Sequence, residues 1–144
     1  MIHARDSFLM HLRSQISPTA CPIHTDPEGQ LPLNAVSVIF LADDVKVPMN
    51  PGLMTVTVSL DLLVEGTATQ RARRRAVTLA MDINKALQGP WVKKQDWSDP
   101  STPRDLGTSI FWRPWGGWKR IPEEDERYAH LNRTLSLFYI GESA

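Results

Sequence analysis

The fold of this chain is decided by residues 55–89, TVTVSLDLLVEGTATQRARRRAVTLAMDINKALQG. Its first seven residues alternate between apolar and polar side chains, which is the period of a strand with one buried face. Thr67 and Gln70 have the T-x-x-Q spacing of a helix capping box. The apolar residues that follow recur at helical spacing: Ala76, Ala80, Ile83 and Leu87. Gly89 and Pro90 end this helix, which we expect to be roughly 30 Å long.

Four arginines crowd the first two turns of the expected helix: Arg71, Arg73, Arg74 and Arg75. Cations are mildly unfavourable there, because a helix N-terminus already carries partial positive charge. A solvated polar face is one interpretation, since charge runs usually face water. A surface that meets an acidic partner is the other. Because only residues three or four apart share a helix face, the run spreads around the helix.

Length and composition predict a single domain over residues 1–144, large enough for its own core. The 16 Lys and Arg balance 16 Asp and Glu, which argues against a whole-protein nucleic-acid binder. The first residues contain no continuous apolar run, so we expect no signal peptide, and no stretch reaches the length of a membrane span. The single cysteine, Cys21, excludes an internal disulfide and suits synthesis in a reducing compartment.

Three other segments have recognisable patterns. Residues 3–16 predict an N-terminal helix, and residues 34–41 (NAVSVIFL) and 133–140 (RTLSLFYI) predict strong strands. Residues 45–53 read as a connecting loop, so the two strands on either side of it should be antiparallel neighbours. The sum predicts an α+β fold: a mostly antiparallel sheet of about four to five strands, with one long helix packed on a face and an N-terminal helix.

Residues 89–127 form a long excursion rich in Trp and Pro, with one possible strand at residues 108–113. A loop this long in a compact domain is usually functional or disordered. All five tryptophans lie here, and three of them flank a predicted turn: Trp112, Trp115 and Trp118. Three interpretations of these tryptophans are open. They fill a small core under the loop, they anchor a protein interface, or they stack on nucleic-acid bases. Nearby basic residues permit the last interpretation, whereas the acidic run that follows opposes it.

No motif for catalysis or cofactor binding is recognisable. The chain contains no G-x-x-x-x-G-K-[ST], G-x-G-x-x-G, H-E-x-x-H or G-x-S-x-G. Cys21-x-x-His24 has half the spacing of a zinc site, but the other histidines form no second pair. The sequence therefore predicts no enzyme, no cofactor and no metal.

The order of these elements resembles the tail terminator proteins of long-tailed bacteriophages. The resemblance rests on the N-terminal helix, the phrase LPLNAVSVIFLADDV at residues 31–45, the strand and helix of residues 55–89, and the closing RTLSLFYI. It covers most of the chain outside residues 89–127. It implies a small subunit that forms a hexameric ring on the last ring of the tail tube.

Such a ring caps the tube, ends its polymerisation and joins the tail to the head connector. The resemblance thus implies a virion protein at the head-proximal end of the tail, assembled in the host cytoplasm and without a membrane partner. Its expected partners are copies of itself, the tube protein and the connector protein, with DNA passing through the ring without specific binding. Neck or head–tail connector proteins, and a nucleic-acid-binding module that uses the Arg and Trp surface, stay open as alternatives.

A neutral chain with separate basic and acidic runs suits head-to-tail contacts, because each interface in a closed ring joins two different surfaces. We expect the arginines of residues 71–75 in one subunit to lie near the acidic run of the next. The candidate residues of that run are Glu123, Glu124 and Glu126. Together with Trp112, Trp115 and Trp118, they are the candidate subunit or tube interface.

Overall fold

The computed structural model describes residues 2–17, 19–41, 44–89 and 91–141. The elements follow in this order: α1 (Ile2–Gln15), β1 (Ile23–Thr25), β2 (Ala35–Phe40), β3 (Val45–Val47), β4 (Asn50–Glu65), α2 (Ala72–Leu87), β5 (Trp91–Asp96), β6 (Arg104–Pro114), β7 (Lys119–Ile121) and β8 (Tyr128–Ile140). Within these residues, neither helix is long and apolar enough to cross a membrane.

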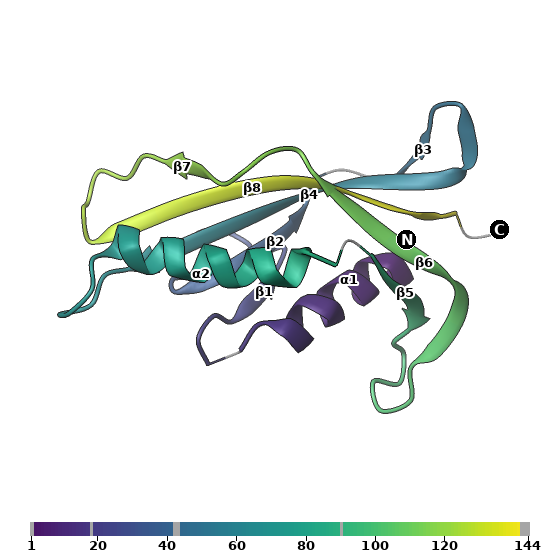
Figure 1. Cartoon of the computed structure of the whole chain (residues 1–144), viewed down its shortest axis with the longest axis horizontal. Coiled ribbons are helices and arrows are strands. Elements are labelled where there is room, and N and C mark those ends of the chain that lie inside the picture. Colours follow the sequence, from purple (N-terminus) through teal and green to yellow (C-terminus); the bar gives the residue numbers. More distant parts are fainter. Residues whose placement is uncertain (1, 18, 42–43, 90, 142–144) are drawn as a thin grey trace.

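The described strands form one sheet of eight, with the order β1-β2-β4-β8-β6-β5. β3 also pairs with β4, and β7 also pairs with β8. The centre is the long antiparallel pair of β4 and β8, which stays in register from Leu53 opposite Ile140 to Glu65 opposite Tyr128 (Figure 1). β1 pairs parallel with β2, whereas β2 and β4 are antiparallel neighbours, as expected.

The predicted sheet of about four to five strands was wrong, because β3, β5 and β7 were not anticipated. β3 lies in the proline-rich segment that reads as a loop. β5 lacks a clear alternation because it has a bulge between Lys93 and Gln95, and because its inward residue Lys94 is charged. β7 is only three residues long, and all three of its residues are exposed. The excursion at residues 89–127 is therefore mostly strand.

The predicted capping box was also wrong. α2 begins at Ala72, with Arg71 as a cap residue that makes no side-chain cap bond. Thr67 and Gln70 instead close a turn before the helix: the Thr67 hydroxyl accepts from Gln70 N at 3.1 Å, and Thr67 N donates to Gln70 O at 2.8 Å. The helix ends at Leu87, and Pro90 of the expected stop signal lies outside the described residues.

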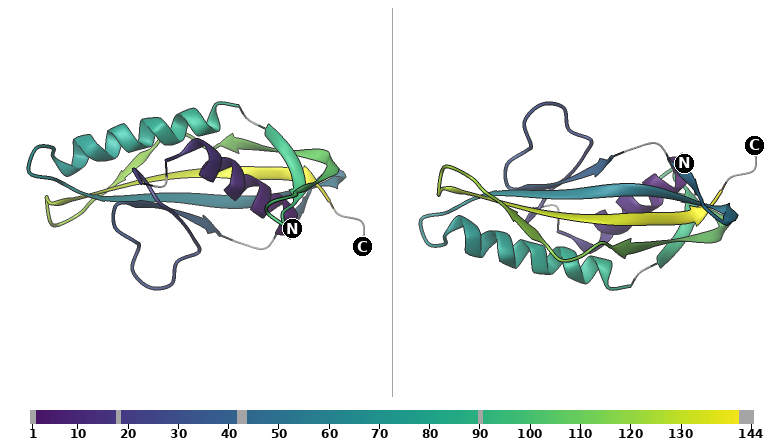
Figure 2. Two further views of the ribbon diagram at one scale, coloured as in Figure 1. Left: turned by 90° about the horizontal axis from the view of Figure 1, so that it is seen from below. Right: turned by 90° about the horizontal axis from the view of Figure 1, so that it is seen from above.

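Both helices pack on one face of the sheet (Figure 2). The core lies between the helices and the sheet and contains Phe8, Leu60, Ile83 and Leu137, each no more than 1% exposed. The alternation of apolar and polar residues along β4 and β8 explains which face the helices cover. The apolar side chains face the helices, because burying that face removes the most apolar surface from water. No helix of the described residues lies on the opposite face, which we call the helix-free face.

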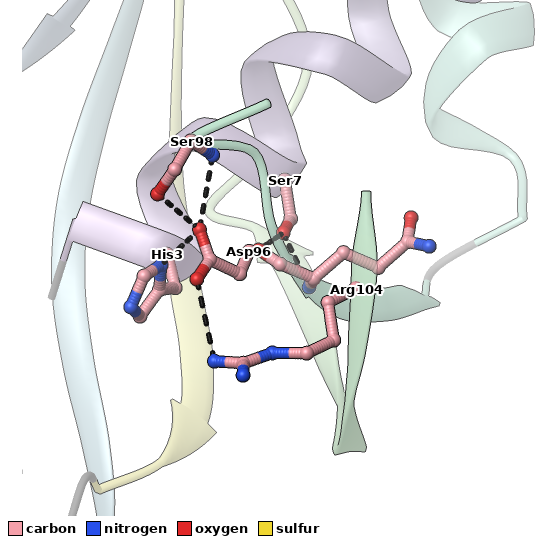
Figure 3. A network of polar contacts seen from close by, with 6 residues as sticks. His3, Ser7, Asp96, Ser98 and Arg104 are labelled. Carbon is pink, nitrogen blue, oxygen red and sulfur yellow. Dashed lines mark hydrogen bonds and ion pairs between the residues drawn. The ribbon is translucent and has the colours of Figure 1, made fainter. Parts of the chain in front are cut away.

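Helix α1 also covers the outer edge of β5. The Ser7 hydroxyl accepts from Gln95 N at 2.9 Å and lies 3.3 Å from Gln95 O, to which it donates. Next to it, the Asp96 carboxylate accepts from Ser98 N at 2.9 Å and from the Arg104 guanidinium at 3.4 Å (Figure 3). Because edge strands with free backbone groups invite pairing with another chain, this contact protects the β5 edge.

Candidate interaction surface

The Arg75 side chain is held by hydrogen bonds within the fold and is not open on the surface. Its Nη1 donates to Asn34 Oδ1 at 2.7 Å and to Glu65 O at 2.8 Å. The same Asn34 oxygen accepts from Glu65 N at 3.0 Å. The guanidinium therefore joins α2 to the segment before β2 and to the end of β4. Of the four candidate arginines, Arg71, Arg73 and Arg74 remain exposed.

Arg71 and Arg73 line a hollow of about 620 Å³ beside the start of α2. Glu123 and Glu126 of the same chain line its other wall. The two charge runs that we expected to meet between subunits therefore lie together within one chain. Pairing between subunits stays a prediction, but Arg71 and Arg73 share this hollow with acidic residues of their own chain.

Glu123 is anchored to the sheet by a polar cluster on β4 and β8. Its Oε1 lies 3.6 Å from His130 Nδ1, and His130 Nε2 lies 2.8 Å from Asp61 Oδ1. Asn132 Nδ2 donates to Asp61 at 3.0 Å, and the Ser59 hydroxyl donates to Asp61 at 3.1 Å. This order of contacts differs from a catalytic triad, in which the histidine contacts the serine. The cluster joins the two central strands.

The three candidate tryptophans have different environments. Trp112 is 3% exposed, its ring makes an edge contact with Phe8 at 5.4 Å, and its Nε1 donates to Leu87 O at 3.0 Å. It belongs to the core, so the expectation that it faces a partner was wrong. Trp118 is partly buried against the core and donates to Asn84 Oδ1 at 2.8 Å. Trp115 alone of the three is largely exposed, at 66%.

A row of side chains on the helix-free face crosses five strands, and four of the five strands contribute an apolar residue to it. Cross-strand partners point to the same face, and the register joins β5, β6, β8, β4 and β3 in one row: Trp91, Phe111, Phe138, Thr55 and Val45. Ile140 lies two residues further along β8 and is 47% exposed. We call Trp91, Phe111, Phe138, Ile140 and Val45 the apolar stripe.

The apolar stripe is open to solvent. Trp91 is 59% exposed and Val45 is 55% exposed. The ring of Phe111, which is 41% exposed, stacks on Phe138. Sequence reasoning missed this surface, although two of the three outward positions in SLFYI, Phe138 and Ile140, are apolar and signal it.

Two cations lie on the same face, one next to the stripe and the other further along β8. Arg113 pairs with Ser136 and Lys119 pairs with Asn132, and both side chains are exposed. Between them, the Trp115 indole lies across β8, held by a bond from its Nε1 to Ser136 Oγ at 2.7 Å. Trp115 and Lys119 also line a small hollow of about 60 Å³. A preorganised aromatic ring beside cations has the composition of an interface hot spot.

The described residues contain no group of three or more His, Cys, Asp or Glu side chains that could hold a metal ion. Cys21 is 1% exposed, and burial raises the pKa of its thiol. A buried, protonated thiol is a poor ligand and nucleophile. His24, the other half of the CxxH spacing, lies on the exposed strand β1.

No protein-family model matches the chain, and no curated protein matches it significantly. The function must therefore be inferred from the surface itself and from the order of the sequence elements. Monomeric soluble proteins rarely expose a large contiguous apolar patch, and larger ones mark interaction sites. The helix-free face, with the apolar stripe and Trp115, is accordingly the candidate functional site.

Proposed function

We propose that this protein is a structural subunit of the tail of a long-tailed bacteriophage. Copies of the chain form a ring that caps the tail tube, ends tube polymerisation and joins the tail to the head connector. The observation that carries the proposal is the apolar stripe, a partly to largely exposed row of side chains from four strands, β5, β6, β8 and β3, on the helix-free face. The order of sequence elements resembles that of tail terminator proteins, and this is why we propose that the surface acts in a phage tail.

The stripe suits a protein partner for two reasons. Its side chains stand on hydrogen-bonded strands of one sheet, so little conformational entropy is lost when a partner covers them. Trp and Phe are also enriched at the centres of protein interfaces, whereas charged residues are depleted there. Both helices occupy the other face, which leaves this face available.

The test is assembly of the purified full chain, alone and with purified tube protein. Native mass spectrometry and negative-stain microscopy should find closed rings, free or seated on tube ends. Trp91→Ser should weaken assembly strongly. Met81→Ser is the matched control, because Met81 is 58% exposed and Trp91 is 59% exposed, yet Met81 lies on α2. A chain that stays monomeric and leaves tube length unchanged would refute the proposal.

A neck or head–tail connector protein is the related alternative. In that case rings should bind the connector but leave tube polymerisation unchanged. The same assay separates the two, because a terminator shortens and caps growing tubes.

A second candidate is binding of single-stranded nucleic acid on the same face. One observation favours it: exposed aromatic rings, Trp91 and Trp115, stand beside Arg113 and Lys119 on a sheet. Bases stack on such rings, and the affinity falls steeply with salt. The chain's net charge of zero counts against it. Fluorescence titration of the tryptophans with oligo-dT at low and high salt decides, since a protein-only surface gives no salt-dependent quenching.

A further inference from the structure

We propose that the ring closes head to tail, with the acidic turn of one copy docked on the Trp115 surface of the next. The acidic turn is residues 121–126, with Glu123, Glu124 and Glu126 as its exposed carboxylates. The Trp115 surface comprises Arg113, Trp115 and Lys119 on the helix-free face. The inference rests on the proposed ring function and names the two surfaces that meet in it.

The acidic turn is preorganised. It connects β7 to β8 at the end of the molecule where α2 begins (Figure 1). Asp125 holds it: its carboxylate accepts from Arg127 N at 2.9 Å and from Arg127 Nη2 at 2.7 Å, and its carbonyl accepts from Tyr128 N at 3.1 Å. Asp125, the remaining acid of the run, is therefore bonded within its own turn. Glu124 and Glu126 are exposed and belong to none of the ion pairs found within the described residues, although Glu126 lines the hollow that also contains Arg71 and Arg73.

The Trp115 surface has the complementary charge. Arg113 and Lys119 are exposed and form no ion pair in the described part of the chain. The indole between them is fixed by Ser136, so its ring offers apolar area without a free polar group. Ile121, which is 37% exposed, begins the acidic turn and supplies an apolar side chain to meet it. A partner that is acidic with one apolar anchor fits this surface.

Within its own chain the turn lies near Lys119, which pairs with Asn132 two residues from His130, but it cannot reach Arg113. Glu123 contacts His130, whereas Arg113 pairs with Ser136 six residues further along β8, about 20 Å away at about 3.3 Å per residue. Two copies that met through identical Trp115 surfaces would bring Arg113 and Lys119 against their like. A second copy that offers its acidic turn removes this repulsion. When each copy offers its acidic turn to the next copy and not back to the one it receives from, the contact is heterologous and generates a ring if its rotation closes.

Charge exchange tests the pairing. One variant carries Arg113→Glu with Lys119→Glu, and the other carries Glu124→Lys with Glu126→Lys. Each alone should associate about tenfold or more weakly than the natural chain in sedimentation velocity, because like charges then face each other. In an equimolar mixture every contact joins opposite charges again, so rings should return with alternating subunits. Association of the natural chain should also weaken as salt rises.

The control is Arg13→Glu with Lys85→Glu, which lowers the net charge by the same amount as Arg113→Glu with Lys119→Glu but on exposed helix positions. It should assemble normally. Thermal unfolding must show that all variants keep the natural chain's melting temperature. The pairing is overturned if both exchange variants assemble like the natural chain, or if their mixture does no better than either alone. If the natural chain and both exchange variants assemble, the pairing is wrong but the proposed ring function still stands. If the natural chain never assembles, both proposals are wrong.

Discussion

Phe111 and Phe138 stack on neighbouring strands with ring centroids 5.1 Å apart and planes at 15°, on the face that no helix covers. Within one copy this contact is half solvated, because Phe111 is 41% exposed. The pair therefore contributes less to folding than a core residue does, and its apolar area remains available to a partner.

This difference predicts a split between stability and assembly along β8. Phe138→Ser should lower the free energy of unfolding by about 1 kcal/mol, since only part of its area is buried. Leu137→Ala, one residue away and 0% exposed, should lower it by about 2–5 kcal/mol. Urea unfolding of both variants measures this, and sedimentation should show that Phe138→Ser weakens assembly. Equal destabilisation by both substitutions would mean that the stripe is part of the core.

The central architecture was predictable because its signals are local. Alternation in residues 55–61 and 133–140 predicted the strands β4 and β8, although not their pairing, and the helical spacing of Ala76 to Leu87 predicted α2. The interface residues were harder. Trp112 and Trp115 differ by three positions, yet one is buried and the other exposed, because pairing with Leu137 turns Trp112 to the helices. Strand pairing decides this, and residue type does not.

Met49 is strained at the tip of the β3–β4 hairpin. Its φ is 65°, a left-handed conformation that favours glycine, and its side chain is fully exposed. Met49→Gly should therefore raise the free energy of unfolding by about 0.5–1 kcal/mol. Thermal unfolding of the monomeric protein measures the change. A loss of more than about 1 kcal/mol would show that the Met49 side chain stabilises the fold despite its exposure.

Gly66 sits where the chain turns from β4 toward α2, and it has no room for a side chain. A Cβ there would lie 3.0 Å from Ala72 N and 3.3 Å from Gln70 O, which are backbone atoms that cannot rotate away. Gly66→Ala should cost about 1–3 kcal/mol of stability. Gly117→Ala is the control, because a Cβ at that position meets nothing within 4 Å. Similar melting temperatures for the two variants would contradict the tight approach.

Arg75 and Arg74 are neighbours in the sequence with unlike roles. Arg75→Ala removes the two bonds to Asn34 and Glu65 and leaves both acceptors half buried, so it should cost about 1.5–3 kcal/mol. Arg74→Ala removes an exposed side chain and should change stability by less than about 0.5 kcal/mol. Chemical denaturation of both variants compares them. If the two lose equal stability, the joint between α2, β4 and the segment before β2 is not formed by Arg75.

Asp44 should make stability sensitive to acid. Burial raises the pKa of its carboxyl, but hydrogen bonds from Tyr139 and Arg5 outweigh this, so the pKa lies below its ordinary value in the folded chain. A lowered folded-state pKa stabilises the fold above the unfolded-state value of about 3.9, and this stabilisation is lost as pH falls through the folded-state pKa. Asp44→Asn should therefore unfold more easily than the natural chain at pH 7, with the difference shrinking below about pH 4. Urea midpoints measured from pH 7 to pH 3 give the comparison. Arg5→Gln should reduce the same acid sensitivity in part, because Tyr139 still donates to the carboxylate. A constant difference at every pH would show that the ionised state of Asp44 contributes nothing to folding.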